Sequence, residues 1–338
     1  MCDFAADPEA AEKILVGRTL TLKRVQELNA KDYFYQMLKD NPNILCIYPG
    51  IEDELIKGGI DCHVHAYPDF VHRAQDMIEV AIDAARSGMR AVAFKDHWNV
   101  SANAAYLVQR HVDHLVATGA LPNGIAVYGG AGTCLGMNVE YVRTALKYPN
   151  CKMLWFPTFT SLGFWRGAGR PEQGGVRLVS EEGEVLPEVV EIMKLAVEHR
   201  IGIGFGHTDF QELLPLARKA QELGVRATLD HPLLELNRLL IDEMQELAAL
   251  GVYVGTYCQP MIPSLYQPVV DPMETIRTIQ AIGPERCIIG SDFGQVLHVK
   301  SIDGMRIFIR ALLGFGIQPD AIRQMLHVNP ARLMWLEE

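Results

Sequence analysis

Eight short apolar segments alternate with amphipathic, helix-like segments along most of this 338-residue chain, and this alternation constrains the fold more than any other feature. The apolar segments carry Val, Ile, Ala and Phe at consecutive positions, which is typical of strands that are covered on both faces. Eight strands separated by helices favour a closed parallel (β/α)8 barrel of the TIM type, in the α/β class. The predicted strands span residues 59–65, 90–96, 124–129, 151–157, 201–206, 226–230, 251–257 and 286–291.

The segments between the strands have the three- and four-residue spacing of apolar positions that indicates helices. Helices are expected over residues 74–88, 186–199 and 241–250, the first ending at Gly88 and the second starting near Pro187. No Gly-x-Gly-x-x-Gly motif opens the first helix, which argues against an open dinucleotide-binding sheet.

The chain divides into two parts. Residues 1–58 are predicted to form a mostly helical N-terminal extension, and residues 59–338 the barrel. The stretch 159–185 is long and Gly-rich, and a loop of this length inside a barrel is usually a lid or a binding loop. The run Gly129-Gly-Ala-Gly132 is expected to form a tight turn after the third strand.

Composition excludes several classes of partner. The net charge is −10 and no basic stripe is present, so nucleic acid is not expected as a partner. No apolar run approaches the roughly 20 residues that cross a bilayer, and the N-terminus lacks the features of a signal peptide, so we expect a cytoplasmic protein without a membrane partner. Seven scattered cysteines without a Cys-x-x-Cys pair indicate reduced thiols.

The first predicted strand ends in His63-Val-His65. Side chains alternate between the two faces of a strand, so both imidazoles are expected on one face and Ile60, Cys62 and Val64 on the other. Two neighbouring neutral imidazoles suit a divalent metal such as zinc.

Polar side chains also follow four other predicted strands. Lys95 and His97 follow the second, His207 the fifth, His231 the sixth and Asp292 the eighth. Because the carboxyl ends of barrel strands meet on one face, where the active sites of such barrels lie, we expect these residues to gather.

This pattern resembles that of the amidohydrolase superfamily: His-x-His after strand one, single histidines after strands five and six, and an aspartate after strand eight. The resemblance covers residues 59–338, and the ending Val328-Asn-Pro-Ala-Arg332 also resembles that of many members. It implies that His63, His65 and His207 are metal ligands. His231 would bind a second metal or assist catalysis, and Asp292 would contact the metal and act as general base.

Binuclear members of that superfamily bridge two metals with a carboxylated lysine or a glutamate that usually follows strand four, and Met153–Thr158 contains neither. Two interpretations remain: the site is mononuclear, or Lys95 is the bridge. Lys95 could instead bind substrate or pair with Asp96 or Asp292. The cofactor is then one or two divalent ions, most simply zinc, although manganese, nickel and iron accept the same ligands.

Three further residues are candidates for substrate binding: His97 at the rim, Arg73 in the loop after the first strand, and Arg166 in the 159–185 loop. Asp209 and Asp230 stand close to ligand histidines in the sequence and are candidates for orienting their rings.

The sequence therefore predicts a metal-dependent hydrolase that acts on a small amide, lactone or ester, with Asp292 as general base. The alternative is a mononuclear-metal, non-oxidative decarboxylase of an aromatic or unsaturated carboxylic acid. A barrel that binds a metal or ligand without catalysis is disfavoured because Asp292 is present. The expected partner is a small-molecule substrate. The sequence does not visibly encode the oligomeric state, and a homo-oligomer stays open because many such barrels dimerise.

Overall fold

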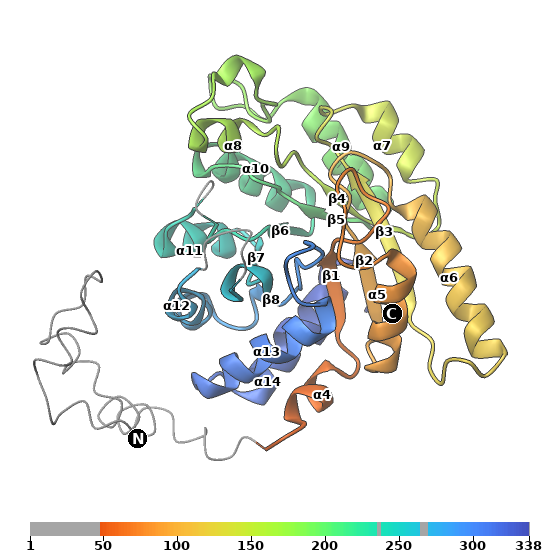
Figure 1. The fold of residues 1–338 in the computed structure, drawn as a ribbon. Helices are drawn as coiled ribbons and strands as arrows, with labels where there is room; N and C mark the ends of the chain where they lie inside the picture. Colours follow the sequence, from red (N-terminus) through yellow and green to blue (C-terminus); the bar gives the residue numbers. More distant parts are fainter. Residues whose placement is uncertain (1–47, 235–237, 264–269, 338) are drawn as a thin grey trace, which may run out of the picture.

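A computed structural model describes residues 48–234, 238–263 and 270–337 as a (β/α)8 barrel of the TIM type (Figure 1). Its eight strands follow one another around the sheet in sequence order, and each neighbouring pair is parallel. Each predicted strand is confirmed in position, although most are shorter than expected. Their bounds are β1 Ile60–Val64, β2 Ala91–Phe94, β3 Ala126–Gly132, β4 Cys151–Trp155, β5 Gly202–Gly204, β6 Ala227–Leu229, β7 Tyr253–Gly255 and β8 Cys287–Ile288.

Helices connect the strands and cover the outside of the sheet (Figure 1). The three helices expected from the sequence are found as α5 Met77–Arg86, α9 Pro187–Glu198 and α11 Ile241–Ala249. The other helical elements are α4 Ile51–Ile56, α6 Ala102–Ala117, α7 Val139–Ala145, α8 Leu162–Gly167, η2 Glu172–Gly174, α10 Phe210–Leu223, η4 Gln259–Met261, α12 Pro272–Ile282, α13 Ser301–Gly314, α14 Pro319–Arg323, η5 Gln324–Val328 and α15 Asn329–Leu333.

The chain that follows β8 closes the barrel against the end of β1. Asp292 N donates to His63 O at 2.8 Å, and His65 N donates to Phe293 O at 2.8 Å. The buried carboxylate of Asp61 accepts from His63 N at 3.2 Å and from Ser291 N at 3.0 Å. Backbone and side-chain hydrogen bonds therefore fix the first and the last strand end to each other.

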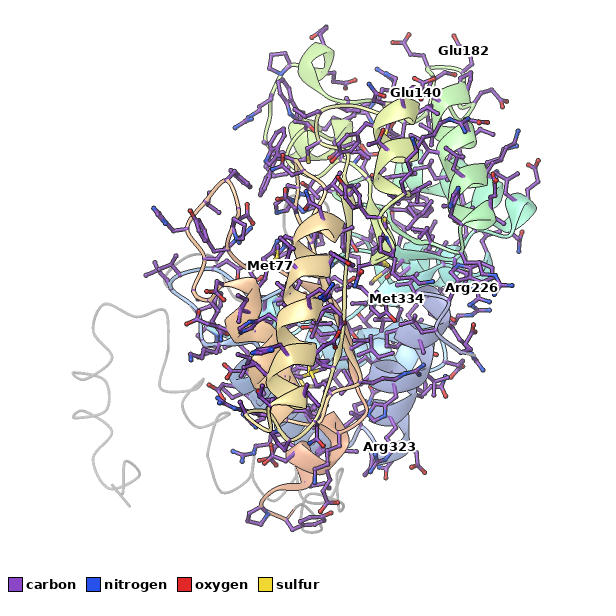
Figure 2. All side chains as sticks on the ribbon, turned by 90° about the vertical axis from the view of Figure 1, so that its right-hand side faces the viewer. Met77, Glu140, Glu182, Arg226, Arg323 and Met334 are labelled. Atoms are coloured by element: carbon purple, nitrogen blue, oxygen red, sulfur yellow. The ribbon has the colours of Figure 1, made fainter. Side chains whose placement is uncertain are left out.

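Apolar side chains fill the barrel, and the C-terminal segment closes the end of the barrel at which the strands begin. Met153 and Trp155 pack inside the sheet with Leu333 and Met334, all of them buried. Below this layer, the Arg226 guanidinium lies 3.5 Å from the centre of the Trp335 ring. In Figure 2, Met334 lies next to the strands, whereas Glu182 projects from the edge of the molecule.

The face pattern expected for the first strand is wrong in part. Ile60 and Cys62 point into the barrel and join the same inner cluster as Trp155, whereas Val64 packs in the outer core. The pairing of β1 with β2 shifts register between Asp61 and Val64. Because a bulge of this kind re-aims the side chains beyond it, the histidines end up on the inner side as well.

The tight turn expected at residues 129–132 is also wrong, because these residues belong to β3. A side chain on Gly130 would collide with the Met153 carbonyl oxygen, and one on Gly132 with the backbone of Asp96 and His97. The glycines are therefore required by close backbone approach within the sheet rather than by a turn.

The 159–185 segment is a long insertion between β4 and α9 that contains the short helices α8 and η2. The buried Glu212 of α10 accepts hydrogen bonds from Leu178 N and Val179 N and so attaches this segment to the barrel. Most of the predicted N-terminal extension lies outside the described residues.

Two further observations concern composition. The five cysteines in the described part of the chain (Cys62, Cys134, Cys151, Cys258 and Cys287) are buried free thiols, as expected. Within the described ranges, no helix has the length and hydrophobicity needed to span a membrane.

The packing that closes the end of the barrel at which the strands begin yields a test of stability. Leu333→Ala should lower the free energy of unfolding by about 2–5 kcal/mol, because it leaves a cavity among fully buried neighbours. Chemical denaturation would measure this. Leu135→Ala is the matched control, since Leu135 is 78% exposed and its loss should have little effect. Equal stability of the two variants would contradict the packing described here.

Candidate metal centre

His63, His65 and Asp292 form a compact buried cluster at the carboxyl ends of β1 and β8. The Nε2 atoms of His63 and His65 each lie 3.3 Å from Asp292 Oδ1. One ligand-type atom from each of the three residues lies within 4.8 Å of the others. Two imidazole nitrogens and a carboxylate oxygen at this separation are a donor set that divalent metals accept.

His207 and His231 lie beside this cluster. Their Nε2 atoms are 3.3 Å apart, and the rings of His231 and His63 are 5.7 Å apart between centres. The structure thus brings together the five residues that the sequence singled out from four different strand ends. His65, His207, His231 and Asp292 open onto a cavity of about 410 Å³ whose other lining residues are Phe70, Val71, Arg73, His97, Trp98, Phe159, Leu234, Gln259 and Gln295.

The backbone is strained at two of these five residues. His231 has φ 33° and Asp292 has φ 53°, in the left-handed region that residues with a Cβ rarely adopt. Only two other described non-glycine residues, Arg200 and Trp335, share this feature. Strained conformations of this kind cluster at functional sites, where the surrounding structure holds them in place.

Several imidazole nitrogens of the cluster lack hydrogen-bond partners. Both ring nitrogens of His63 and the Nδ1 atoms of His207 and His231 are buried without such a partner in the described structure. A buried polar atom without a partner is costly, and a bound cation would supply one. The cluster therefore fits a metal by donor type and by unmet bonding capacity.

The charge states of four residues of the cluster suit a cation. The pKa of His63 is instead raised, because burial and Lys95 lower it by less than Asp230 and Asp292 raise it. Burial lowers the pKa of His65 and His207 well below the usual value and that of His231 to about 4, so these rings are neutral at pH 7, the form that binds metals. Burial by itself raises the pKa of Asp292, but His231, His63 and His65 lower it more, so the carboxylate stays ionised.

Lys95 lies under the cluster and pairs with Asp230. Its Nζ is 3.4 Å from Asp230 Oδ2, and both side chains are fully buried. The sequence offered Asp96 or Asp292 as partners, and that expectation is wrong. Lys95 continues the inward-facing row of Ala91 and Ala93, so it meets the inward-facing Asp230 across the barrel. Its role as a metal bridge stays a prediction.

Asp230 contacts three groups rather than the neighbouring His231 alone. Besides Lys95, it accepts a hydrogen bond from the Tyr257 hydroxyl at 3.1 Å and lies 3.5 Å from His63 Nδ1. Burial raises the pKa of Asp230, but Lys95 and His63 lower it more, so it falls below its usual value. An ionised Asp230 is thus placed to orient His63, whose Nε2 faces Asp292.

His97 reaches the cavity from the loop after β2. Its ring is stacked on His65 with 4.8 Å between centres, and its Nδ1 lies 2.8 Å from Thr158 Oγ1. Trp98, next along the chain, lines the same cavity.

The two candidate arginines are placed differently. Arg73 lines the cavity, pairs with Asp69 at 2.7 Å and contacts His65 Nδ1 at 3.3 Å. Arg166 pairs instead with Asp209 and Glu172 outside the residues that line the cavity. Asp209 also caps the N-terminus of α10, so its carboxylate holds Arg166 and the helix end rather than the ring of His207.

Three residues of the site escaped the sequence reasoning: Asp61, Thr158 and Tyr257. Tyr257 follows the seventh strand, where the other strands of the site also carry polar residues, and that signal could have identified it. Asp61 and Thr158 act through hydrogen bonds to groups distant in sequence, and no local pattern marks them.

Comparison with solved structures identifies the class of fold. An amidohydrolase from Pseudomonas aeruginosa matches with a TM-score of 0.54 at 13% identity, over 84% of this chain and 98% of that chain. A mutant of a lactonase related to phosphotriesterase, from Deinococcus radiodurans, matches with a TM-score of 0.50 at 15% identity, over 83% and 97%. These neighbours are amidohydrolase-superfamily members, so the resemblance seen in the sequence is confirmed at the level of the fold.

Comparison of sequences gives the family. Residues 58–255 match the family of unknown function DUF6282, and the chain belongs to that family. No curated protein matches the sequence.

The contacts of Asp230 generate a prediction about metal affinity. Asp230→Asn should weaken metal binding about 10- to 100-fold, because it removes the charge that orients His63 and balances Lys95. Competition with a chromogenic chelator would measure the change. Asp209→Asn is the matched control, since Asp209 holds Arg166 and should leave affinity unaltered. Unchanged affinity in Asp230→Asn would refute the orienting role.

Proposed function

We propose that this chain is a metal-dependent hydrolase of a small amide, lactone or ester. The observation that carries the proposal is the convergence of His63, His65, His207, His231 and Asp292 beside one cavity, with buried imidazole nitrogens that have no hydrogen-bond partner in the described structure. His63, His65, His207 and Asp292 would hold the ion, most simply zinc.

The chemistry divides between the ion and the side chains. When bound, the metal would supply a Lewis acid that makes water nucleophilic near neutral pH. Asp292, ionised and directed into the cavity, would accept the proton from the attacking water and return it to the leaving group. His231, held 3.3 Å from His207, would donate a hydrogen bond to the developing oxyanion.

Arg73 and the cavity walls would position the substrate. A guanidinium only donates hydrogen bonds, so His65 Nδ1 accepts in its contact with Arg73. Arg73 also lines the cavity. There it could bind a substrate carboxylate or carbonyl between the aromatic walls of Phe70 and Phe159.

A second candidate function is the non-oxidative decarboxylation of an aromatic or unsaturated carboxylic acid. The end of β4 favours it: Pro157 and Thr158 follow the strand where binuclear sites need a carboxylated lysine or a glutamate, and Thr158 contacts His97. Release of carbon dioxide from an aromatic acid, without hydrolysis of lactones, esters or amides, would favour this function over the first.

The number of ions depends on Lys95. While Lys95 is paired with Asp230, as here, the site would hold one ion. A site with two ions would instead need Lys95 to be carboxylated and to face the histidines, because an ammonium group has no lone pair for a metal.

The general-base role of Asp292 can be tested by Asp292→Asn. Turnover should fall about 10²- to 10⁴-fold, because the amide cannot accept the proton. Asn tolerates the left-handed backbone found at this position, so the fold should survive. The assay is hydrolysis of a panel of lactones, esters and amides, with circular dichroism and metal content measured on the same samples.

Asp303→Asn is the control for this change, because Asp303 is exposed on α13 and pairs with Arg306. A folded, metal-loaded Asp292→Asn variant with undiminished turnover would eliminate Asp292 as the base.

A further inference from the structure

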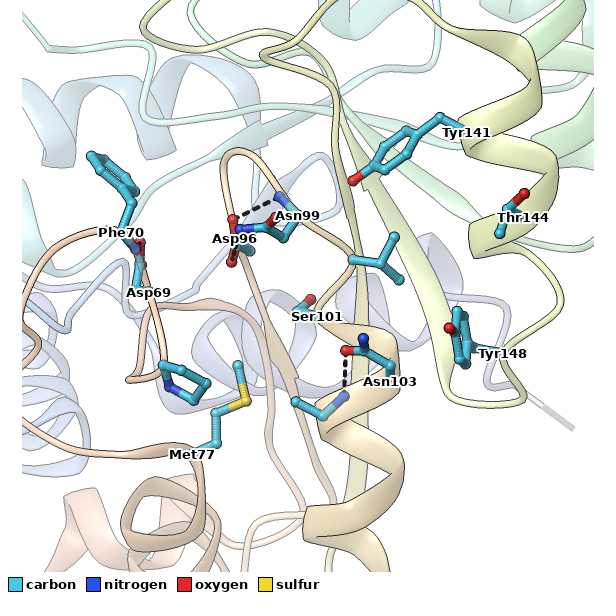
Figure 3. A pocket seen from close by; sticks show the side chains of 13 residues that line it. Asp69, Phe70, Met77, Asp96, Asn99, Ser101, Asn103, Tyr141, Thr144 and Tyr148 are labelled. Carbon is cyan, nitrogen blue, oxygen red and sulfur yellow. Dashed lines mark hydrogen bonds between the residues drawn. The ribbon is translucent and has the colours of Figure 1, made fainter.

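A second cavity of about 600 Å³ lies beside the metal-centre cavity and has a different lining. It is bounded by the loop after β1, by the loop that joins β2 to α6, and by α7 (Figure 3). Phe70 lines both cavities, and its ring packs against His97 and Trp98 of the first. The two spaces are therefore neighbours separated by Phe70 and the 96–99 loop.

The lining of the second cavity offers hydrogen-bond donors and acceptors together. Asp69 and Asp96 supply carboxylate oxygens, and Asn103 supplies an amide. The first turn of α6 also lines the space, and its N-cap residue Ser101 makes no side-chain cap. Backbone N–H groups at such a helix start are donors that need partners.

Tyr141 contributes a hydroxyl group to this lining. Figure 3 shows its ring pointing from α7 into the space, with the hydroxyl toward the loop that carries Asp96 and Asn99. That hydroxyl is buried and has no hydrogen-bond partner in the described structure. A buried hydroxyl without a partner costs free energy that a ligand hydroxyl would recover.

The charges of the lining select the kind of ligand. The described residues that line the cavity include no Lys or Arg, which disfavours an anion. Both carboxylates already have partners: Asp96 accepts from Trp98 N and Asn99 N, and Asp69 pairs with Arg73. They therefore do not need a cation, yet each retains lone pairs that can accept from a hydroxyl group.

Apolar walls complete the lining. Phe70, Met77 and Tyr148 provide flat or apolar surface around the polar groups. Carboxylates, an amide and a tyrosine hydroxyl beside aromatic rings suit a molecule with several hydroxyl groups on a compact carbon skeleton. We propose that this cavity is a second binding site, for a neutral, hydroxyl-rich ligand of the sugar or polyol class.

The site needs no metal, so its test is independent of the proposed hydrolase function. Binding of D-glucose, myo-inositol and glycerol to the full chain would be measured by saturation-transfer NMR and by calorimetry, with putrescine as a cationic probe. At least one neutral polyol should bind, and Tyr141→Phe should weaken that binding about three- to tenfold, the effect of one lost hydrogen bond. Tyr106→Phe is the matched control, because Tyr106 is exposed on α6 and does not line the cavity.

Three outcomes would overturn the inference. No binding of any neutral polyol would remove the site, and binding of putrescine alone would contradict the ligand class. Polyol binding that a chelator abolishes, or that Tyr141→Phe leaves unaltered, would place the ligand elsewhere. Binding that survives the chelator and responds only to Tyr141→Phe would support the site even if no hydrolase activity is found.

Discussion

The seam between β1 and the chain after β8 is the contact on which the candidate metal centre depends. It joins residues more than 200 positions apart, through Asp292 N to His63 O, His65 N to Phe293 O and the buried Asp61 carboxylate. Without these bonds, His63, His65 and Asp292 would have no fixed separation. The same bonds hold Asp292 in its left-handed conformation. The hydrogen bonds that close the barrel therefore also fix the positions of the three residues of the site.

Because barrel closure buries these side chains, it also determines their protonation states. Burial keeps His65, His207 and His231 neutral, while His231, His63 and His65 keep Asp292 ionised. Lys95 and Asp230 form a buried pair beneath them, and the Tyr257 hydroxyl satisfies a further lone pair of that carboxylate. A buried ion pair adds little stability by itself but is costly to break, so its value here lies in holding His63 in position.

Much of the barrel and of the site could be predicted from the sequence. Apolar strand segments and the polar residues that follow them are local signals, and the meeting of strand ends on one face converts them into a cluster. What failed depends on contacts that no local pattern encodes. Ile60 and Cys62 point inward, as do the histidines that follow the register shift in β1, and the pairing of Lys95 with Asp230 joins residues 135 positions apart. The turn predicted at the glycines of β3 is absent from the structure. The sequence could not show this, because only the packed sheet reveals which backbone atoms approach these glycines.

The most direct test of the central claim is the metal content of the chain, measured by elemental analysis of protein purified without chelators. The account predicts one or two equivalents of a divalent metal in the unmodified chain. It predicts none in a His63→Asn/His65→Asn variant that remains folded by circular dichroism. Absence of metal from the unmodified chain, even after incubation with zinc or manganese, would contradict the account, as would equal metal content in the two proteins.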